Sequence, residues 1–428
     1  MQNPTANMLT RAAEYSFLLL VFSLAFMQPQ LPFGGTSVTI TDGLFLVTLA
    51  IWLAAVISGR SGTFFHSSFI LFGLYGIGLT LSAVLSEEPR RSSIKLIGEL
   101  YLIALAAVTA NIVLTEKARK RVVIVWIAAA GIACFIGVLA VICFYAGAEN
   151  IVTRFALHHF GSLPPGHYPR LQGTFLYPAV LCNYLTVALM MTFAAWELKW
   201  ITTTVFTVLI SSMAITIAFT ITPGLGGILL AVGICLWSRS MQKGQRTLGR
   251  ISLCTGFLSA MLFWLVSAVT VIPSPTSPFS WSLDGLRIDP TQRLLTWMGA
   301  AGTFISHPLF GKGLGLPVAE VYFMPPSGQM QLLTDAHNFV LNIAGQAGLA
   351  GVVPLVLICV CLVWGGRDMF RSPHGSDPVE RALWTAFVSA FVVQGMVGSF
   401  EDSRHLWALM GLMIAGKRSS RGLVVVGG

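Results

Sequence analysis

Long apolar segments separated by short polar ones run along most of the chain. Twelve of them approach the length of about 20 apolar residues that a helix needs to cross a bilayer core. Because a backbone in hydrocarbon must satisfy its own hydrogen bonds, we predict twelve membrane-spanning helices. They lie near residues 12–30, 39–58, 68–86, 96–114, 123–146, 178–196, 201–222, 224–237, 251–272, 338–364, 382–399 and 404–416.

Two polar segments between spans are much longer than the others, 146–178 and 273–337. Connections of this length in a compact protein are usually functional or disordered. The second segment predicts an amphipathic helix in DPTQRLLTWMGAAGTFISHP, with Asp289 as its cap and Pro290 at its first position. We expect this helix to lie along the membrane surface, with Trp297 at the interface.

The composition agrees with this pattern. Of 428 residues, 55% are hydrophobic and 10% are charged, whereas soluble proteins carry roughly 25% charged residues. We therefore predict an all-α polytopic membrane protein with a single integral membrane domain over residues 1–428, and 146–178 and 273–337 as its two outer loops.

The net charge of +9 is explained by the basic residues that a membrane protein carries on its cytoplasmic side. With twelve spans, most lysines and arginines fall on the side that also holds both chain ends, which the positive-inside rule identifies as cytoplasmic. The charge therefore indicates no nucleic-acid partner. Four arginines depart from the rule and lie in the two long outer loops: Arg154, Arg170, Arg287 and Arg293.

The stretch LTDAHNFVLNIAGQAGLAG, residues 333–351, places polar residues at the mouth of an apolar run. If a helix begins near Asp335, which can cap it, then Asn338, Asn342 and Gln346 share one face. Such amides either bond to neighbouring helices or line a wet site, and the sequence leaves both open. His337 is either an interfacial histidine or a general base, since an imidazole titrates near neutral pH.

Arg170 and Arg293 carry planar, permanently charged groups that match phosphate oxygens. They either bind a lipid-linked phosphate or attract lipid headgroups. The break TPGLGG at residues 222–227 has two interpretations as well, close helix packing or the lining of a cavity.

Other chemistries lack support in the sequence. We find no cluster of residues at metal-ligand spacing, so we predict no metal and no cofactor. The run GKGLG does not have the phosphate-loop pattern. A lipid or solute transporter, the alternative from another class, predicts internal repeats and polar sites at mid-membrane, and neither is present in the sequence.

Three stretches in order resemble the O-antigen ligase and O-antigen polymerase superfamily. They are RLQGTFLYPAVLCNYL, QRLLTWMGAAGTFISHPLFGKGLG and DAHNFVLNIAGQAGLAG, which together cover roughly residues 170–351. Two features depart from the family pattern. The span-seven break lacks a basic residue, and Ala179 stands where an asparagine is usual.

The resemblance implies a glycosyltransferase of the bacterial inner membrane with its active site facing the periplasm. Its donor would be a glycan on undecaprenyl pyrophosphate, and its acceptor lipid A–core. His337 would be the general base of an inverting, metal-independent transfer, and Arg170 and Arg293 would bind the pyrophosphate. Supporting candidates are Asn338, Arg287, Asp335 and Asp402. We favour a ligase of lipopolysaccharide biosynthesis over the alternative, an O-antigen or exopolysaccharide polymerase.

Overall fold

The computed structural model describes residues 4–33, 36–59, 61–158, 168–270, 281–283, 286–323, 330–371 and 377–419. Its helices are α1 (Pro4–Ser23), α2 (Ile40–Ile57), α3 (Ser68–Val84), α4 (Pro89–Ile112), α5 (Glu116–Tyr145), α6 (Ile151–Ala156), α7 (Pro178–Glu197), α8 (Thr203–Thr220), α9 (Leu225–Gln242), α10 (Arg246–Ala268), α11 (Gln292–Ser306), α12 (Phe339–Arg371), α13 (Pro378–Ala386), the π-helix η1 (Phe387–Val393) and α14 (Arg404–Ser419).

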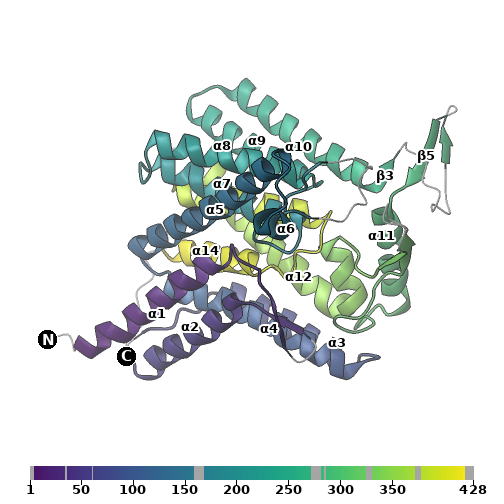
Figure 1. Ribbon diagram of the computed structural model, residues 1–428. Helices are drawn as coiled ribbons and strands as arrows, with labels where there is room; N and C mark the ends of the chain where they lie inside the picture. Colours follow the sequence, from purple (N-terminus) through teal and green to yellow (C-terminus); the bar gives the residue numbers. More distant parts are fainter. Residues whose placement is uncertain are drawn as a thin grey trace.

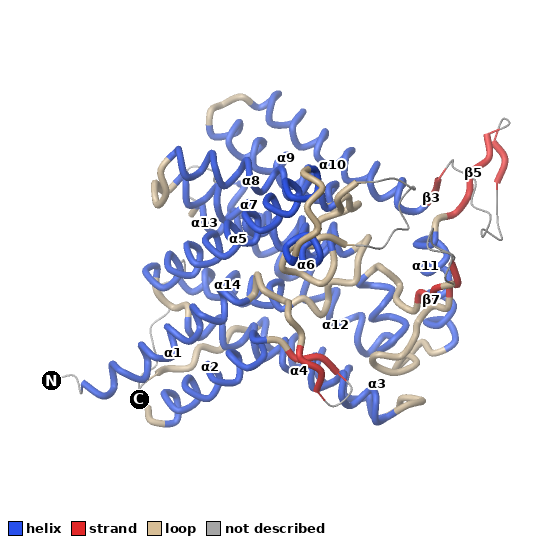
Figure 2. The backbone as a smooth tube through the Cα atoms, viewed as in Figure 1, coloured by secondary structure: helices blue, strands red, loops and turns tan. Residues whose placement is uncertain are grey.

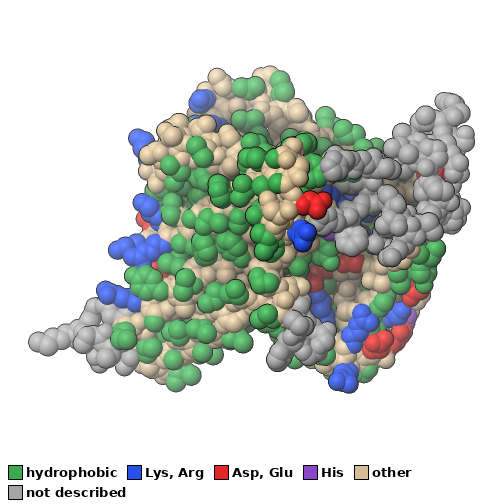
Figure 3. Space-filling view, viewed as in Figure 1, with side chains coloured by type: hydrophobic (Ala, Val, Ile, Leu, Met, Phe, Trp, Pro, Cys, Tyr) green, Lys and Arg blue, Asp and Glu red, His purple; other side chains and the backbone are tan. Residues whose placement is uncertain are grey.

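Each predicted span overlaps a helix, although α1 ends at Ser23, before the predicted end at residue 30. The span at 382–399 overlaps α13 and η1. Among the described residues, eight helices are long and apolar enough to cross a membrane. The all-α polytopic class is therefore confirmed. The helices form one bundle with both chain ends at the left of the view, and α11 and β5 lie at the opposite side (Figure 1). Hydrophobic side chains cover the middle of the surface (Figure 3).

The sequence did not predict the short antiparallel hairpins, which lie between helices (Figure 2). The strands are β1 (Leu31–Phe33), β2 (Thr36–Val38), β3 (Val269–Thr270), β4 (Trp281–Leu283), β5 (Leu286–Pro290), β6 (Val321–Phe323) and β7 (Gln331–Leu333). They pair as β1–β2, β3–β5–β4 and β6–β7. The pairing of β3 with β5 joins the end of α10 to the beginning of α11.

A buried polar network closes the break between α8 and α9. Asn183 of α7 donates from Nδ2 to the carbonyl of Ala390 in η1 at 2.7 Å and to Gln394 Oε1 at 2.8 Å. Gln394 Nε2 donates to the carbonyl of Gly224 in the break at 2.7 Å. His405 Nε2 lies 2.7 Å from Asn183 Oδ1. These side chains thus bond to one another and to backbone carbonyls of the irregular segments, so these polar groups have partners in the membrane interior.

Helix α12 is broken at Gly348, where φ is 59° and ψ is −155°. Beyond the break, the amides of Leu349 and Ala350 donate to carbonyls at residues 308–309 at 2.8 and 3.0 Å. The amides of residues 312–313 donate back to carbonyls at residues 345–346 at 2.9 and 3.0 Å. The turn that follows α11 therefore takes the place of the missing helical bonds of α12.

Helices α3 and α4 bond both to this turn and to the part of α12 that the turn contacts. Ser82 Oγ donates to the carbonyl of Gln346 at 2.8 Å, and Ser92 Oγ donates to the carbonyl of Leu314 at 2.9 Å. GKGLG is thus a docking segment between α12 and the N-terminal helices. This explains its glycines, because side chains would separate the two backbones.

Gly311 tests this docking. Its φ is +70°, and a Cβ there would overlap the backbone of Gln346. We expect Gly311→Ala to destabilise the protein by more than about 1 kcal/mol, since both strain and overlap oppose the side chain. Thermal unfolding of the purified protein in detergent measures this loss.

Gly302→Ala is the matched control, because Gly302 lies inside α11 with open space around its Cβ position. Alanine at such a helical position stabilises by roughly 0.5–1 kcal/mol. Equal melting temperatures for the two variants would contradict the docking of residues 308–313 on α12.

Candidate active site

Helix α11 is anchored at its N-terminus to α10. Thr291 Oγ1 donates to the carbonyl of Ser267 at 2.6 Å, and the Thr291 amide donates to the carbonyl of Ala268 at 2.9 Å. Thr291 is also the N-cap of α11. The prediction of Asp289 as the cap and Pro290 as the first helical residue was wrong, since strand pairing with β3 takes both residues into β5.

Trp297 fixes the other side of α11. It is 7% exposed and stacks on Trp264 of α10, with ring centroids 5.4 Å apart. Trp297 therefore packs against protein, and its place at the membrane interface stays a prediction. The ring is part of the contact that positions Arg293, one turn earlier on the same helix.

The backbone just before His337 is held from two sides. Thr296 of α11 donates from Oγ1 to the carbonyl of Ala336 at 3.2 Å. The amide of Ala336 lies 3.4 Å from Asn342 Oδ1 of α12. Because Thr296 and Arg293 are three residues apart on one helix, this link also fixes Arg293 relative to His337.

His337 has a left-handed backbone, with φ of 49°. Histidine is one of the few non-glycine residues that adopt this conformation with any frequency, and such strain gathers at functional sites. Asp335 Oδ1 accepts from the His337 amide at 2.6 Å and also from Ser399 Oγ. Asp335 therefore shapes the turn that presents His337. It does not cap α12, which begins four residues later at Phe339.

The imidazole of His337 is 37% exposed, and its Nδ1 lies 3.9 Å from Asp335 Oδ1, too far for a hydrogen bond. Burial lowers the pKa of His337, the negative charge of Asp335 opposes this, and the positive charge of Arg293 lowers it further. The pKa falls below its usual value of 6.5. At neutral pH the ring is therefore neutral and able to accept a proton.

Arg170 and Arg293 lie near each other. Burial and the charge of Arg170 lower the pKa of Arg293 to about 10, and burial lowers the pKa of Arg170 as well. Arg170 Nε donates to the carbonyl of Thr220 at 3.4 Å, at the end of α8. Among the described residues, no carboxylate forms an ion pair with either guanidinium. Two uncompensated cations therefore stand beside a neutral histidine, and an anion between them would be stabilised.

The polar face of α12 is buried and bonded to protein. Asn338 Oδ1 accepts from the amides of Val340 and Leu341, both at 3.1 Å, so Asn338 is the cap of α12. Its Nδ2 donates to the carbonyl of Met396 at 3.2 Å. Gln346 Oε1 accepts from the amide of Gly315 at 2.8 Å. Asn338 and Gln346 therefore form hydrogen bonds within the protein, the first as a helix cap and the second to the turn at Gly315.

Two acidic residues after η1 have partners away from the arginines. Asp402 pairs with Lys95 of α4, which also lies 3.3 Å from Glu99. Glu401 accepts from Asn342 Nδ2, and burial raises its pKa, with Asp402 adding to the effect. Asp402 therefore contacts Lys95 rather than His337, and its supporting role is to fasten this turn to α4.

Sequence reasoning missed Lys95 and Glu99, although their i, i+4 spacing in α4 was a visible signal for an ion pair. It also missed Thr296, whose role depends on a contact 40 residues away in sequence. Arg287 pairs through its backbone with Ser282 in the β4–β5 hairpin. Its side chain, proposed as a supporting group, lies outside the described residues.

An apolar cavity of about 310 Å³ opens beside this cluster, between α9, α10 and the end of η1. It is lined by Pro223, Gly226, Gly227, Leu230, Phe257, Ala260, Met261, Trp264, Val392, Val393, Gln394, Met396 and Val397. A Cβ at Gly226 would lie 2.8 Å from Phe263 Cβ. The glycines of the α8–α9 break thus do both things considered from the sequence: they permit close packing and they line a cavity.

Three residues that line the cavity connect it to elements of the charged cluster. Trp264 stacks on Trp297 of α11, and the carbonyl of Met396 accepts from Asn338. Pro223 follows the segment whose Thr220 carbonyl accepts from Arg170. An apolar groove and an anion-binding cluster are therefore adjacent, which suits an amphipathic ligand with a charged head.

Comparison with known families agrees with the motifs. Residues 206–356 match the family model described as O-antigen ligase. The matched segment includes Arg293 and His337, whereas Arg170 precedes it. No curated protein matches the chain. The resemblance to the O-antigen ligase and polymerase superfamily is thus confirmed.

The titration of His337 tests the geometry of the cluster. We expect its midpoint below pH 6.5. Arg293→Gln should raise the midpoint by removing a repelling charge, and Asp335→Asn should lower it by removing an attracting one. The measurement is the pH dependence of His337 acylation by diethyl pyrocarbonate, resolved by peptide mass spectrometry.

Acylation of the unfolded protein serves as the reference, because His337 there lacks both neighbours. A midpoint that does not respond to Arg293→Gln would show that the two groups are not close.

Proposed function

We propose that this protein is an O-antigen ligase, a membrane glycosyltransferase that moves a glycan from undecaprenyl pyrophosphate to a sugar of lipid A–core. One observation carries the proposal. Arg293 lies near both Arg170 and His337, beside an apolar groove, and neither arginine forms an ion pair with a carboxylate among the described residues. The family match to residues 206–356 supports the class of reaction.

Arg170 and Arg293 bind the pyrophosphate of the donor. Guanidinium groups form paired hydrogen bonds to phosphate oxygens, and their charge stabilises the pyrophosphate as it departs. The mutual repulsion of the two arginines is relieved when the anion enters. The arginines therefore bind the pyrophosphate most strongly in the transition state, when negative charge develops on it.

His337 acts as the general base. The acceptor hydroxyl oxygen attacks the anomeric carbon, the carbon–oxygen bond to pyrophosphate breaks, and the hydroxyl proton passes to the imidazole. Undecaprenyl pyrophosphate leaves with the bonding electron pair. Because attack and departure occur on opposite faces of the sugar, the anomeric configuration inverts. Asp335 holds the turn on which His337 stands and stabilises the imidazolium that forms.

The groove between α9, α10 and η1 holds part of the polyprenyl chain. Its lining is almost wholly apolar. Met396 and Trp264 of the lining contact Asn338 and Trp297, and Pro223 lies three residues after Thr220, whose carbonyl accepts from Arg170. A lipid-linked donor has the same layout, a charged head followed by a long hydrocarbon chain. The positive-inside distribution supports a site that faces the periplasm of a bacterial inner membrane, with both termini in the cytoplasm.

Substitution of the three charged residues tests the mechanism. We expect His337→Ala to lower transfer by about 10²–10⁴-fold, the usual contribution of a general base. Arg170→Lys and Arg293→Lys should also reduce transfer, because an ammonium cannot form the paired bonds of a guanidinium. Arg154→Lys is the matched control, since Arg154 is exposed on α6 in the same outer loop as Arg170.

The assay is the lipopolysaccharide profile of a deletion strain that carries each variant, at equal protein level. Failed ligation leaves bare core with polymer retained on the carrier lipid. Core bearing a single repeat would instead identify a polymerase. Full transfer by His337→Ala would overturn the assignment of the base.

Filling the groove tests the placement of the chain. Val393 lines the groove from η1, and Val393→Trp should raise the KM for the undecaprenyl-linked donor about tenfold, through lost apolar contacts. The KM for a donor with a short citronellyl chain should stay unchanged. Ile215→Trp, on the exposed surface of α8, is the control. Equal effects on both donors would place the chain elsewhere.

A further inference from the structure

A second pocket lies at the far ends of the helices that form the candidate site. It is lined by residues near the end of α7, the end of α9 and the beginning of α13. Helix α9 begins at the apolar groove, which it lines as far as Leu230. Arg239 of the pocket lies nine residues further on, about 14 Å along that helix. The pocket lies towards the end of α9 that carries Arg239 and Lys243, the side that the positive-inside rule identifies as cytoplasmic and opposite to the candidate site.

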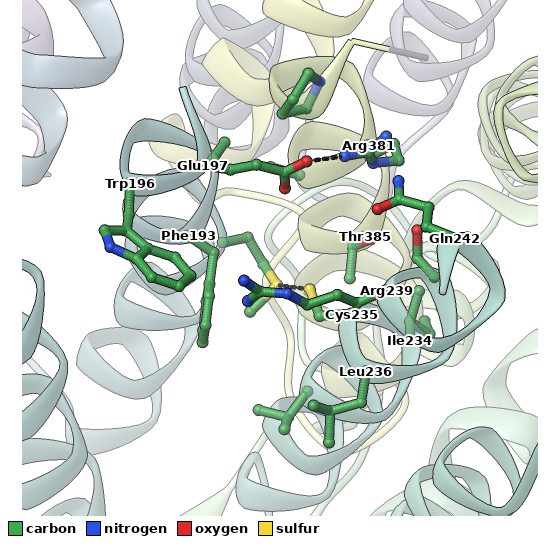
Figure 4. A pocket seen from close by; sticks show the side chains of 16 residues that line it. Phe193, Trp196, Glu197, Ile234, Cys235, Leu236, Arg239, Gln242, Arg381 and Thr385 are labelled. Carbon is green, nitrogen blue, oxygen red and sulfur yellow. Dashed lines mark hydrogen bonds and ion pairs between the residues drawn. The ribbon is translucent and has the colours of Figure 1, made fainter. Parts of the chain in front are cut away.

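The pocket has an apolar interior and a charged mouth (Figure 4). Met190, Phe193, Val232 and Leu236 supply hydrocarbon, and Arg239 stands among them. Figure 4 shows the guanidinium of Arg239 directed towards Phe193. It lies 4.8 Å from the ring centroid of Trp196, a cation–π contact.

The charged residues at the opening of this pocket have a net positive charge. Arg381 forms an ion pair with Glu197 at 2.6 Å, so this carboxylate is already neutralised. Among the described residues, no carboxylate pairs with Arg239. Lys243 follows one turn later at the end of α9. The mouth therefore carries a surplus positive charge beside an indole, and Figure 3 shows Lys and Arg side chains gathered along the same edge as the chain ends.

We propose that this pocket binds an anionic phospholipid of the leaflet opposite the candidate site. The lipid phosphate contacts Arg239 and Trp196, and the first part of one acyl chain covers Phe193, Val232 and Leu236. Basic pockets between helices on this side of a membrane favour anionic headgroups, and tryptophan is typical of the interface. A free anion would leave the apolar lining uncovered, so a lipid fits the pocket better than inorganic phosphate.

Lipid-dependent thermal stability of the whole protein tests this proposal, because a ligand that binds only the folded state raises the melting temperature. In detergent, dioleoyl phosphatidylglycerol should raise it more than dioleoyl phosphatidylcholine. Arg239→Gln should weaken the apparent affinity for phosphatidylglycerol about fivefold, the usual effect of one basic residue at a membrane surface. Inorganic phosphate should give no shift.

Two further variants keep the result unambiguous. Arg250→Gln removes a charge from an exposed position on α10, outside the pocket, and should keep the wild-type preference. Leu236→Trp fills the pocket at a half-exposed position without changing its charge and should abolish the preference even if Arg239→Gln fails to fold. Equal stabilisation by both lipids, or a preference that survives either pocket variant, would overturn the proposal. So would a shift with inorganic phosphate.

Discussion

Backbone hydrogen bonds between residues 308–313 and the broken turn of α12 join the large outer loop to the membrane-embedded helices. This contact stands between Arg293 on α11, which precedes the turn, and His337, which precedes α12. A long loop without such an anchor would leave the two charged groups free to move apart. With this contact, the helix bundle fixes the relative positions of both groups. The conformational entropy of the loop is therefore lost during folding rather than at substrate binding.

The same constraint recurs deeper in the molecule. Hydrocarbon offers no hydrogen-bond partners, so any departure from a regular helix needs a partner from the protein. The α8–α9 break finds one in Gln394, and η1 finds one in Asn183. These irregular segments border the apolar groove and the end of α8 that contacts Arg170. The candidate site therefore borders interrupted helices. Polar side chains bond at the α8–α9 break and at η1, and backbone groups of residues 308–313 bond at the break of α12.

Much of this could be predicted from the sequence, because the signals were local. Apolar runs located the helices, eight of which are long and apolar enough to cross a membrane among the described residues. Motif order selected Arg170, Arg293 and His337, and the fold brings Arg293 within range of the charges of the other two. The remainder depended on contacts between distant residues. Nothing near Asp402 in sequence indicates Lys95 as its partner, and nothing near Asp289 indicates that strand pairing would displace it from a helix cap. The break at Gly348 could not be predicted for the same reason, since the amides beyond it bond to residues 308–309 of a turn far earlier in the sequence.

The serines of α3 and α4 have a consequence for how proteins of this kind diversify. Ser82 and Ser92 bond to Gln346 and Leu314, and a Cβ at Gly313 would overlap Ser86. The N-terminal third of the chain carries none of the three motifs. Its helices α3 and α4 nevertheless form part of the surface that contacts the glycine-rich turn. Recombination that exchanged only the motif-bearing half between relatives would combine α3 and α4 of one protein with the glycine-rich turn of another. These two surfaces pack so closely that a mismatch would disrupt their hydrogen bonds. We therefore expect the two halves to be inherited together. Substitutions in α3 and α4 at this contact should be accompanied by substitutions in the turn.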